Sequence, residues 1–258
     1  MKSILVCIKA VPVTASVQVD GAYRLKREGA GLQWNIADES ALEAALSLKD
    51  QDGTVTVATM GPPKLEVPLR DLLARGCDRV ILITDRLMAG ADTRATARAL
   101  GAAAERLGPF DLILCGRRAV DGETGQVPGE LAAALGIPCV SNAEKLEREG
   151  EELLVHRRLE NGVQVLSARG PLVVSVCEYT YRLRLPGILS MRRARDREVE
   201  TYSSADLGLT EDQCGLKGSL TQVIAMESKF PGLRRGPRTA DLGAGIEALR
   251  VFLRGARQ

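Results

Sequence analysis

Short apolar strands alternate with amphipathic helices through the first half of the chain, and this alternation restricts the possible folds more than any other feature of the sequence. Within residues 41–48, for example, apolar side chains at positions i, i+3, i+4 and i+7 predict one face of a helix. Such an alternation predicts a parallel sheet with helices on both faces. The predicted strands cover residues 3–8, 54–60, 79–84 and 111–115, and the predicted helices lie around residues 41–48, 69–73, 97–107 and 130–135.

Polar residues and glycines mark the ends of these helices. Either Asp38 or Ser40 can cap the start of the first helix, and Ser40 with Glu43 has the S-x-x-E spacing of a capping box. Gly76 suits a left-handed end for the second helix. The pair Gly108-Pro109 ends the third.

The pattern changes after about residue 140. Residues 153–159 and 163–168 flank Asn161-Gly162, the usual signal for a type I′ hairpin, and residues 172–176 form another apolar strand. The only histidine, His156, lies in this hairpin, so a structural role is favoured over a catalytic one.

The last sixty or so residues lack the strand–helix alternation and contain helical pieces such as residues 246–253. They are too poor in apolar residues to form a core alone, and an arm of this kind usually wraps a partner or the main domain. The sequence therefore predicts a doubly wound, mostly parallel α/β sheet over residues 1–190, with a late β-hairpin, and a C-terminal arm over residues 191–258.

Composition excludes several classes of function. The 35 Lys and Arg against 33 Asp and Glu give a net charge of +2, so no strong overall electrostatic field attracts the chain to nucleic acid or anionic lipid. No apolar run approaches the roughly 20 residues that cross a bilayer, so no membrane insertion is expected. The six cysteines form no CxxC pair, which argues against a metal site and favours a reduced, cytoplasmic location.

In a doubly wound sheet, ligands bind beyond the carboxyl ends of the strands, where residues 9–38, 60–64 and 116–129 form loops. The strongest candidate is the segment Ala119–Gly136, which is rich in glycine and runs into a helix whose N-terminus can bind a phosphate. An ordinary glycine-rich turn is an equally good interpretation of its spacing alone, and the segments Asn35–Asp38 and Met60–Pro63 taken alone are typical of a cap and a turn. Convergence of the three at one edge favours a nucleotide site.

The arginine-rich stretch at residues 181–197 contains the apolar segment Leu185–Leu189. Such a stretch is more often a solvated face, but an apolar tip flanked by cations resembles a docking loop. No residue set resembles an acid–base pair or an activated nucleophile, so no catalytic residue is expected.

An ordered set of motifs covers most of the chain: VCIKAV, NIADESALEAALSLK, GCDRVILI, FDLILCGRRAVDGETGQVPGELAAALG, VHRRLENGVQVLSARGPLVVSV and RLPGILSMRRAR. In these motifs the chain resembles the β subunit of the electron transfer flavoproteins, the ETF β/FixA family. The resemblance implies a Rossmann-like fold of the adenine nucleotide alpha hydrolase type.

The resemblance implies a heterodimer in which an α subunit holds most of the redox-active FAD and is wrapped by the C-terminal arm. The β crevice holds AMP in ordinary members and a second FAD in electron-bifurcating members. By motif position the nucleotide contacts are Cys7, Asn35, Ile36, Ala37, Asp38, Met60, Asp121, Gly122, Glu123, Thr124, Gly125, Gln126, Val127 and Pro128.

The resemblance also implies protein partners: acyl-CoA dehydrogenases of fatty acid β-oxidation, or related dehydrogenases, as electron donors, and an acceptor such as an ETF–quinone oxidoreductase. Leu185 would be the anchor of the docking loop. The expected docking residues are Leu185, Pro186, Gly187, Ile188, Leu189, Arg192 and Arg193.

Some residues depart from the family pattern. The loop DGETGQVP is closer to the form found in bifurcating members, whereas Thr14 replaces a tyrosine near the flavin and Ser190 a lysine after the anchor. We expect AMP, with a second FAD as the alternative. An ATP-binding or ATP-hydrolysing α/β domain is a different class, weakened by the missing Walker lysine, and a structural subunit with an empty crevice is a third possibility.

Overall fold

The computed structural model describes residues 1–13, 18–19, 25–26, 31–224 and 241–255. The chain divides into two compact units, Met1–Val223 and Ile224–Gln258. The first unit extends beyond the boundary that we expected between residues 190 and 191, because β13 (Glu200–Tyr202) pairs with β7 (Arg79–Ile83) at the edge of the main sheet.

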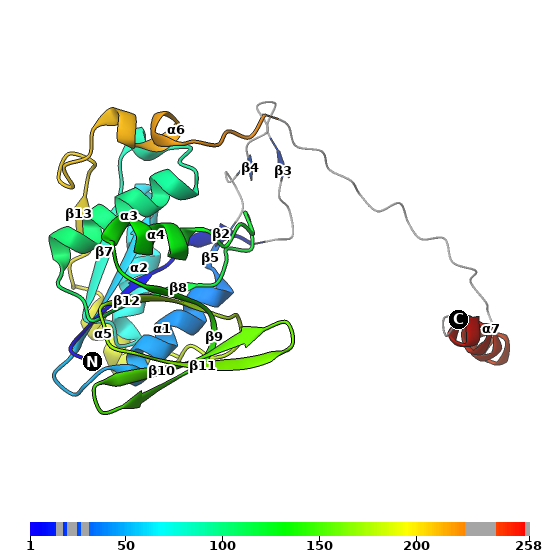
Figure 1. Ribbon diagram of the computed structural model, residues 1–258. Helices are drawn as coiled ribbons and strands as arrows, with labels where there is room; N and C mark the ends of the chain where they lie inside the picture. The colour runs from blue at the N-terminus through cyan, green and yellow to red at the C-terminus, as the bar shows by residue number, and fades with distance from the viewer. Residues whose placement is uncertain (14–17, 20–24, 27–30, 225–240, 256–258) are drawn as a thin grey trace. The chain divides into compact units, whose positions relative to one another are not determined.

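The first unit is built on a nine-stranded sheet in the order β11-β10-β9-β12-β8-β1-β6-β7-β13 (Figure 1). The β9–β10 and β10–β11 pairs are antiparallel, and the other strand pairs of this sheet are parallel. This confirms the predicted α/β class with a mostly parallel sheet and a late hairpin. The remaining strands are β1 (Ser3–Cys7), β6 (Thr54–Met60), β8 (Leu112–Gly116), β9 (Cys139–Glu149), β10 (Glu152–Leu159), β11 (Gly162–Ala168) and β12 (Leu172–Val176).

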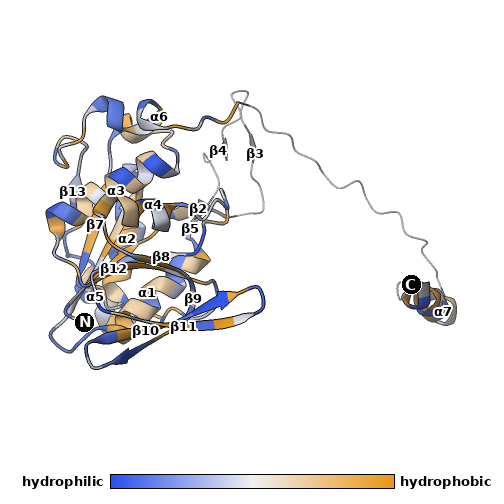
Figure 2. Cartoon of the chain, viewed as in Figure 1, coloured by the Kyte–Doolittle hydropathy of each residue, from blue (hydrophilic) through white to orange (hydrophobic). Residues whose placement is uncertain are grey.

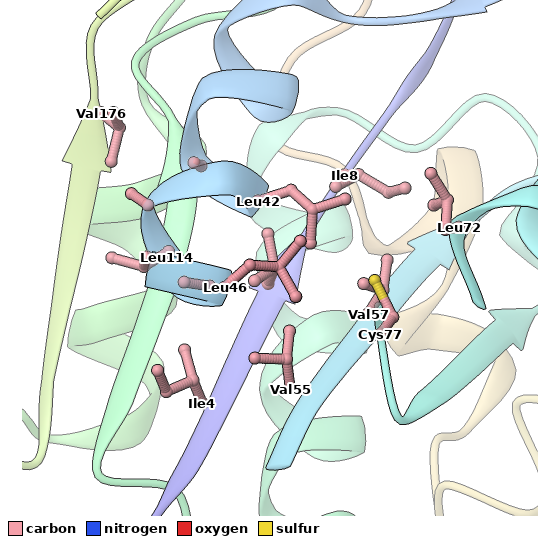
Figure 3. Packing of buried hydrophobic residues seen from close by; sticks show 14 of the residues in the cluster. Ile4, Ile8, Leu42, Leu46, Val55, Val57, Leu72, Cys77, Leu114 and Val176 are labelled. Atoms are coloured by element: carbon pink, nitrogen blue, oxygen red, sulfur yellow. The ribbon is translucent and has the colours of Figure 1, made fainter. Parts of the chain in front are cut away.

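Helices cover both faces of the sheet because side chains alternate along each parallel strand. Ile4 and Val6 of β1 join one apolar cluster with α1 (Ile36–Leu48) and α2 (Glu66–Ala74), and Figure 3 shows Leu42 and Leu46 of α1 in this packing. Leu5 points into the opposite cluster, with α3 (Thr93–Leu107) and α4 (Val127–Leu135). Each fully buried leucine contributes roughly 1.5–3 kcal/mol.

Shorter elements complete the described parts. Figure 2 shows the hydrophobic residues concentrated in the central strands, while hydrophilic residues are frequent on the β10–β11 hairpin. No helix in the ranges that the structure describes is both long and apolar enough to cross a membrane. The shorter elements are β2 (Ala10–Pro12), β3 (Gln18–Val19), β4 (Leu25–Lys26), β5 (Leu32–Trp34), η2 (Pro63–Leu65), η3 (Arg86–Met88), α5 (Ile188–Ala194), η4 (Glu211–Gln213), α6 (Gly215–Gly218) and α7 (Leu242–Gly255).

The start of α1 differs from the predicted cap. The helix begins at Ile36, so Asp38 and Ser40 lie inside it and neither is the N-cap residue. Ser40 Oγ instead contacts two carbonyl oxygens, that of Ile36 at 3.3 Å and that of Tyr181 at 3.1 Å. Both polar side chains are buried and serve tertiary contacts, which local spacing does not reveal. The predicted left-handed end of α2 is confirmed, since Gly76 has a φ of +110°.

The hairpin turn also differs from the prediction. Leu159 pairs with Gly162, so the two-residue loop is Glu160-Asn161, and neither of these residues has the positive φ of a type I′ turn. The register follows the core, because Leu153 and Val155 must point into the apolar cluster, and a shift by one residue would turn both outward.

The described part of the second unit contains α7, where we predicted a helical piece. Its apolar residues Leu242, Ile246, Leu249 and Leu253 repeat at i, i+4, i+7 and i+11, which places them on one face. All four side chains are at least 47% exposed. Among the described residues of the second unit, nothing covers the apolar face of α7.

Candidate functional site

The carboxyl ends of β1, β6 and β8 lie side by side, because β1 pairs in parallel with both of the other strands. Helix α1 starts at the same edge. We use the name rim for the residues that surround this edge, 7–9, 35–38, 60–64 and 116–128. The rim contains the three loops that the sequence predicts to converge.

Asp38 joins two sides of the rim from inside. Its Oδ2 accepts a hydrogen bond from the backbone N–H of Lys9 at 2.7 Å, and its Oδ1 accepts one from Gly116 at 3.0 Å. A Cβ atom on Gly116 would lie 2.1 Å from Asp38 Oδ1, so only glycine fits there. The carboxyl is buried, and loss of hydration raises the pKa of Asp38 to about 7, although contacts with Asn35, Lys9 and Gly116 oppose this rise.

Asn35 makes the same kind of connection. Its side chain is fully buried, its Nδ2 donates to the carbonyl of Arg118 at 2.9 Å and its Oδ1 accepts from the N–H of Val120 at 3.2 Å. The polar side-chain atoms of Asn35 and Asp38 are bonded to other parts of the protein, so these two residues hold the loops of the rim together. The Asn35 side chain does not cap α1, so the N–H groups of Ile36 and Ala37 lie in an uncapped first turn, where a helix has no acceptors of its own.

An ion pair closes the outer side of the rim. Lys9 Nζ lies 2.7 Å from Asp121 Oδ1, which joins the segment after β1 to the loop after β8. The Asp121 carboxylate is buried and Lys9 is 43% exposed. Asp121 was predicted from the sequence, whereas Lys9 was missed because its partner lies 112 residues away in the chain.

The loop from Gly122 to Gln126 is exposed and leads into α4. Glu123 and Gly125 have positive φ angles, and a Cβ atom on Gly122 would meet nothing within 4 Å. At the end of the loop, Thr93 Oγ1 lies 3.2 Å from Gln126 Oε1. The predicted residues Thr124, Val127 and Pro128 follow in this loop and the first turn of α4.

Cys7 and Met60 are the strand-end residues at this edge. Cys7 is buried opposite Cys115 on β8, and the contact between the two thiols, with burial, raises the pKa of Cys115 well above its usual value. Both cysteines therefore act as small core residues. Met60 is half-buried at the end of β6.

Two arginines after β8 were missed as site residues. Arg117 binds Glu178 through a fork of two contacts at 3.0 and 2.6 Å, and this lowers the pKa of Glu178. Arg118 lies 3.7 Å from Glu123 and 3.9 Å from Glu178. The available signal was a pair of arginines at the end of a strand, but Glu178, which both arginines approach, comes from the segment after β12.

The expected docking residues lie elsewhere. We use the name docking segment for residues 181–197, which include α5. Leu185, Ile188 and Leu189 are 83%, 86% and 70% exposed. The Arg197 guanidinium donates to the carbonyl of Asp78, immediately before β7, so the segment reaches the amino edge of the sheet, opposite the rim. The remaining expected docking residues, Pro186, Gly187, Arg192 and Arg193, lie in the same segment.

The remaining expectations concern a metal site, His156 and Thr14. Within the described ranges, no three His, Cys, Asp or Glu side chains are grouped as a metal site would require. His156 lies on β10 with Nε2 2.8 Å from Glu147 Oε2, away from the rim. Thr14 falls outside the described residues.

Comparison with known proteins identifies the family. The family model described as the electron transfer flavoprotein domain matches residues 24–207. The chain belongs to the electron transfer flavoprotein family. The predicted resemblance is thereby confirmed, and the family implies a flavin-linked role in electron transfer.

Named relatives in this family narrow the subunit type. The chain is 41% identical to the electron transfer flavoprotein subunit beta of Thermoanaerobacterium thermosaccharolyticum, over 86% of each chain. It is 40% identical to protein FixA of Azorhizobium caulinodans, over 85% of this chain and 82% of that one. It is 38% identical to the caffeyl-CoA reductase-Etf complex subunit CarD of Acetobacterium woodii, over 86% of each. The chain is thus an electron-transfer subunit of the β/FixA type.

Proposed function

We propose that this chain is the β subunit of a two-chain, cytoplasmic electron transfer flavoprotein, in which an α subunit holds most of the redox-active FAD and the rim of β holds AMP. The heterodimer takes electrons from acyl-CoA dehydrogenases or related dehydrogenases. It passes them to an acceptor such as an ETF–quinone oxidoreductase.

The geometry of the rim carries the proposal. Asp38 joins the backbone of Lys9 and Gly116, and the Lys9–Asp121 pair joins the same two loops a second time. The rim is therefore held in shape without a ligand. The uncapped first turn of α1 and the N-terminal turn of α4 both offer N–H groups, which suit the phosphate of a nucleotide.

This chain contributes to electron transfer by binding and orientation. The flavin supplies the electron-accepting chemistry when it is bound. The side chains of the rim bind and orient the nucleotide, and the side chains of the docking segment bind the partner. An activated nucleophile is not needed, which agrees with the raised pKa of the buried Cys115 thiol.

A second FAD in the rim is the other candidate for the nucleotide. The loop DGETGQVP at residues 121–128 is closer to the form of bifurcating members, and residues 122–126 are exposed, with open space at Gly122. A second FAD would place its adenosine diphosphate at the same N–H groups.

The second unit supports the two-chain arrangement. The apolar face of α7 has no cover among the described residues of its own unit, and residues 191–258 were expected to form an arm that wraps an α subunit. We expect a chain truncated after Val223 to lose most of its heterodimer yield in co-expression. An unchanged yield would remove the arm from the proposal.

The decisive experiment is cofactor analysis of the co-expressed heterodimer. After acid extraction, chromatography should give one FAD and one AMP per heterodimer. Two FAD and no AMP would replace AMP by a second flavin. A heterodimer without any nucleotide beyond one FAD would refute the rim site, and formation of ADP from added ATP and Mg²⁺ would favour a nucleotide hydrolase instead.

A further inference from the structure

Arg184 lies immediately before the exposed Leu185 and is held at each of its polar groups. Its backbone N–H donates to Glu43 Oε2 at 3.0 Å, and its guanidinium binds the same carboxylate with Nη2 2.7 Å from Oε1. Its carbonyl accepts a hydrogen bond from Arg75 Nη1 at 2.9 Å. One residue is thus fixed to both α1 and α2.

The two ends of the docking segment are also fixed. The carbonyl of Tyr181 lies 3.1 Å from Ser40 Oγ of α1, and the Tyr181 hydroxyl accepts from the N–H of Leu146 at 2.8 Å. At the other end Ala194 is buried, and Arg70 Nε donates to the carbonyl of Arg197 at 3.1 Å. The exposed part between these ends is therefore short and held from both sides.

The exposed part combines apolar and cationic side chains. Leu185, Ile188, Leu189 and Met191 are all more than half exposed. Arg192 and Arg193 form no ion pair within the described residues, so their charges face solvent. An apolar tip beside unpaired cations is complementary to an apolar socket bordered by carboxylates.

We infer that Glu43 and Arg184 form a mount that holds the docking segment in its binding conformation, for a redox partner protein that presents an apolar socket bordered by carboxylates. The inference rests on the proposed function. The contact between Glu43 and Arg184 removes the cost of ordering the segment at each encounter, which is how preorganisation raises affinity. Both are positioning residues, because Glu43 is 14% exposed and acts through Arg184.

The first test uses the purified heterodimer alone. We expect Glu43→Gln to speed amide hydrogen exchange in residues 184–191 by about tenfold, which corresponds to about 1.4 kcal/mol of local ordering. The matched control is Glu144→Gln, which removes a similar carboxylate–arginine pair, with Arg158, between β9 and β10. Unchanged exchange in the Glu43→Gln variant would overturn the mount.

The second test measures electron transfer from a purified acyl-CoA dehydrogenase with its acyl-CoA substrate. We expect Glu43→Gln to raise the KM for the heterodimer by about tenfold at unchanged kcat and FAD content, and Glu144→Gln to leave KM unchanged. Arg184→Lys keeps the charge but loses the fork, so the mount predicts a similar rise in KM.

The outcomes separate the two claims. A wild-type KM in the Arg184→Lys variant would show that Arg184 acts by charge alone and would overturn the mount. A wild-type heterodimer that accepts no electrons from the dehydrogenase would refute the proposed donor, whereas the exchange experiment would still decide the mount.

Discussion

The rim lies at the carboxyl edge of the sheet, whereas the docking segment extends to the amino edge, and both are fastened to α1. At the rim the fastening is Asp38, a buried carboxyl that accepts backbone N–H groups from two loops. At the docking segment it is Glu43, a carboxylate near the surface that binds the side chain and the N–H of Arg184. The two carboxyls lie on the same helix but in different surroundings.

Because of this difference, the contacts around Asp38 matter for the stability of the fold, and the docking segment matters for binding a partner. Around Asp38 the packing is so close that even a methyl group on Gly116 would collide with α1. Around Leu185 the side chains are exposed, and the fold does not depend on them. Substitutions at the buried contacts around Asp38 should therefore lower the stability of the fold, while substitutions at the tip should change only partner binding.

The largest effect is expected for Gly116→Ala. The new Cβ would lie 2.1 Å from Asp38 Oδ1 and 2.7 Å from the Asp38 backbone nitrogen, which forces α1 away from β8. We expect the free energy of unfolding to fall by more than about 4 kcal/mol, the exceptional range for one substitution. Urea denaturation measures it.

The matched control is Gly129→Ala in α4, where a Cβ would meet nothing within 4 Å. Alanine favours a helix, so this variant should gain roughly 0.5–1 kcal/mol. If both variants lost the same stability, the close packing of the rim would not be the cause.

The pH dependence of stability gives the next effect. Folding raises the pKa of Asp38 from 3.8 to about 7, so the folded state binds the proton more tightly than the unfolded state. Its contribution is fully present below about pH 4 and is lost as the pH rises through about 7. The difference between these pKa values corresponds to roughly 4 kcal/mol.

Asp38→Asn isolates this contribution, because the other titrating groups are the same in both proteins. The asparagine NH₂ would also face the N–H of Lys9 or Gly116, which lowers the stability of the variant by an amount that does not depend on pH. Its deficit in the free energy of unfolding should be largest near pH 4 and shrink toward pH 8. A deficit that grows with pH would mean that Asp38 is stabilised as the anion.

A smaller effect is expected for Lys9→Met, which removes the ion pair with the buried Asp121 carboxylate. We expect a loss of about 1–2 kcal/mol, between the values for exposed and buried pairs. Lys2→Met removes an exposed pair with Asp52 and should leave the free energy of unfolding nearly unchanged. Equal losses in thermal or urea unfolding would contradict the distinction.

The smallest effect on stability is expected for Leu185→Ala at the docking tip. The side chain is 83% exposed, so the free energy of unfolding should stay within about 0.5 kcal/mol of wild type. The same variant should raise the KM for a donor dehydrogenase. A clear loss of stability would show that the tip packs against the fold after all.

The sheet was predictable where apolar periodicity is strong. The strands at residues 3–7, 54–60, 79–83 and 112–116 and the helices between them lie close to their predicted places. β9 was missed because its residues are mostly polar, and β13 because three residues carry no periodic signal.

The location of the candidate site could be predicted from the sequence better than the contacts that each of its side chains makes. Asn35 and Asp38 were found from their position at a helix start, but their buried contacts with Arg118 and Gly116 depend on segments about 80 residues away. Lys9 and Arg117 were missed for the same reason. Local spacing indicates where loops gather, whereas the pairing of side chains depends on the folded chain.

The position of Asp38 and Glu43 on α1 limits how this segment can change in length. They lie about one and a half turns apart on one rigid helix, so each side chain contacts a different neighbouring segment. Inserting or deleting one residue between them would rotate one carboxyl by about 100° relative to the other. Changes in chain length are therefore excluded between these two positions, even where changes of residue type are tolerated.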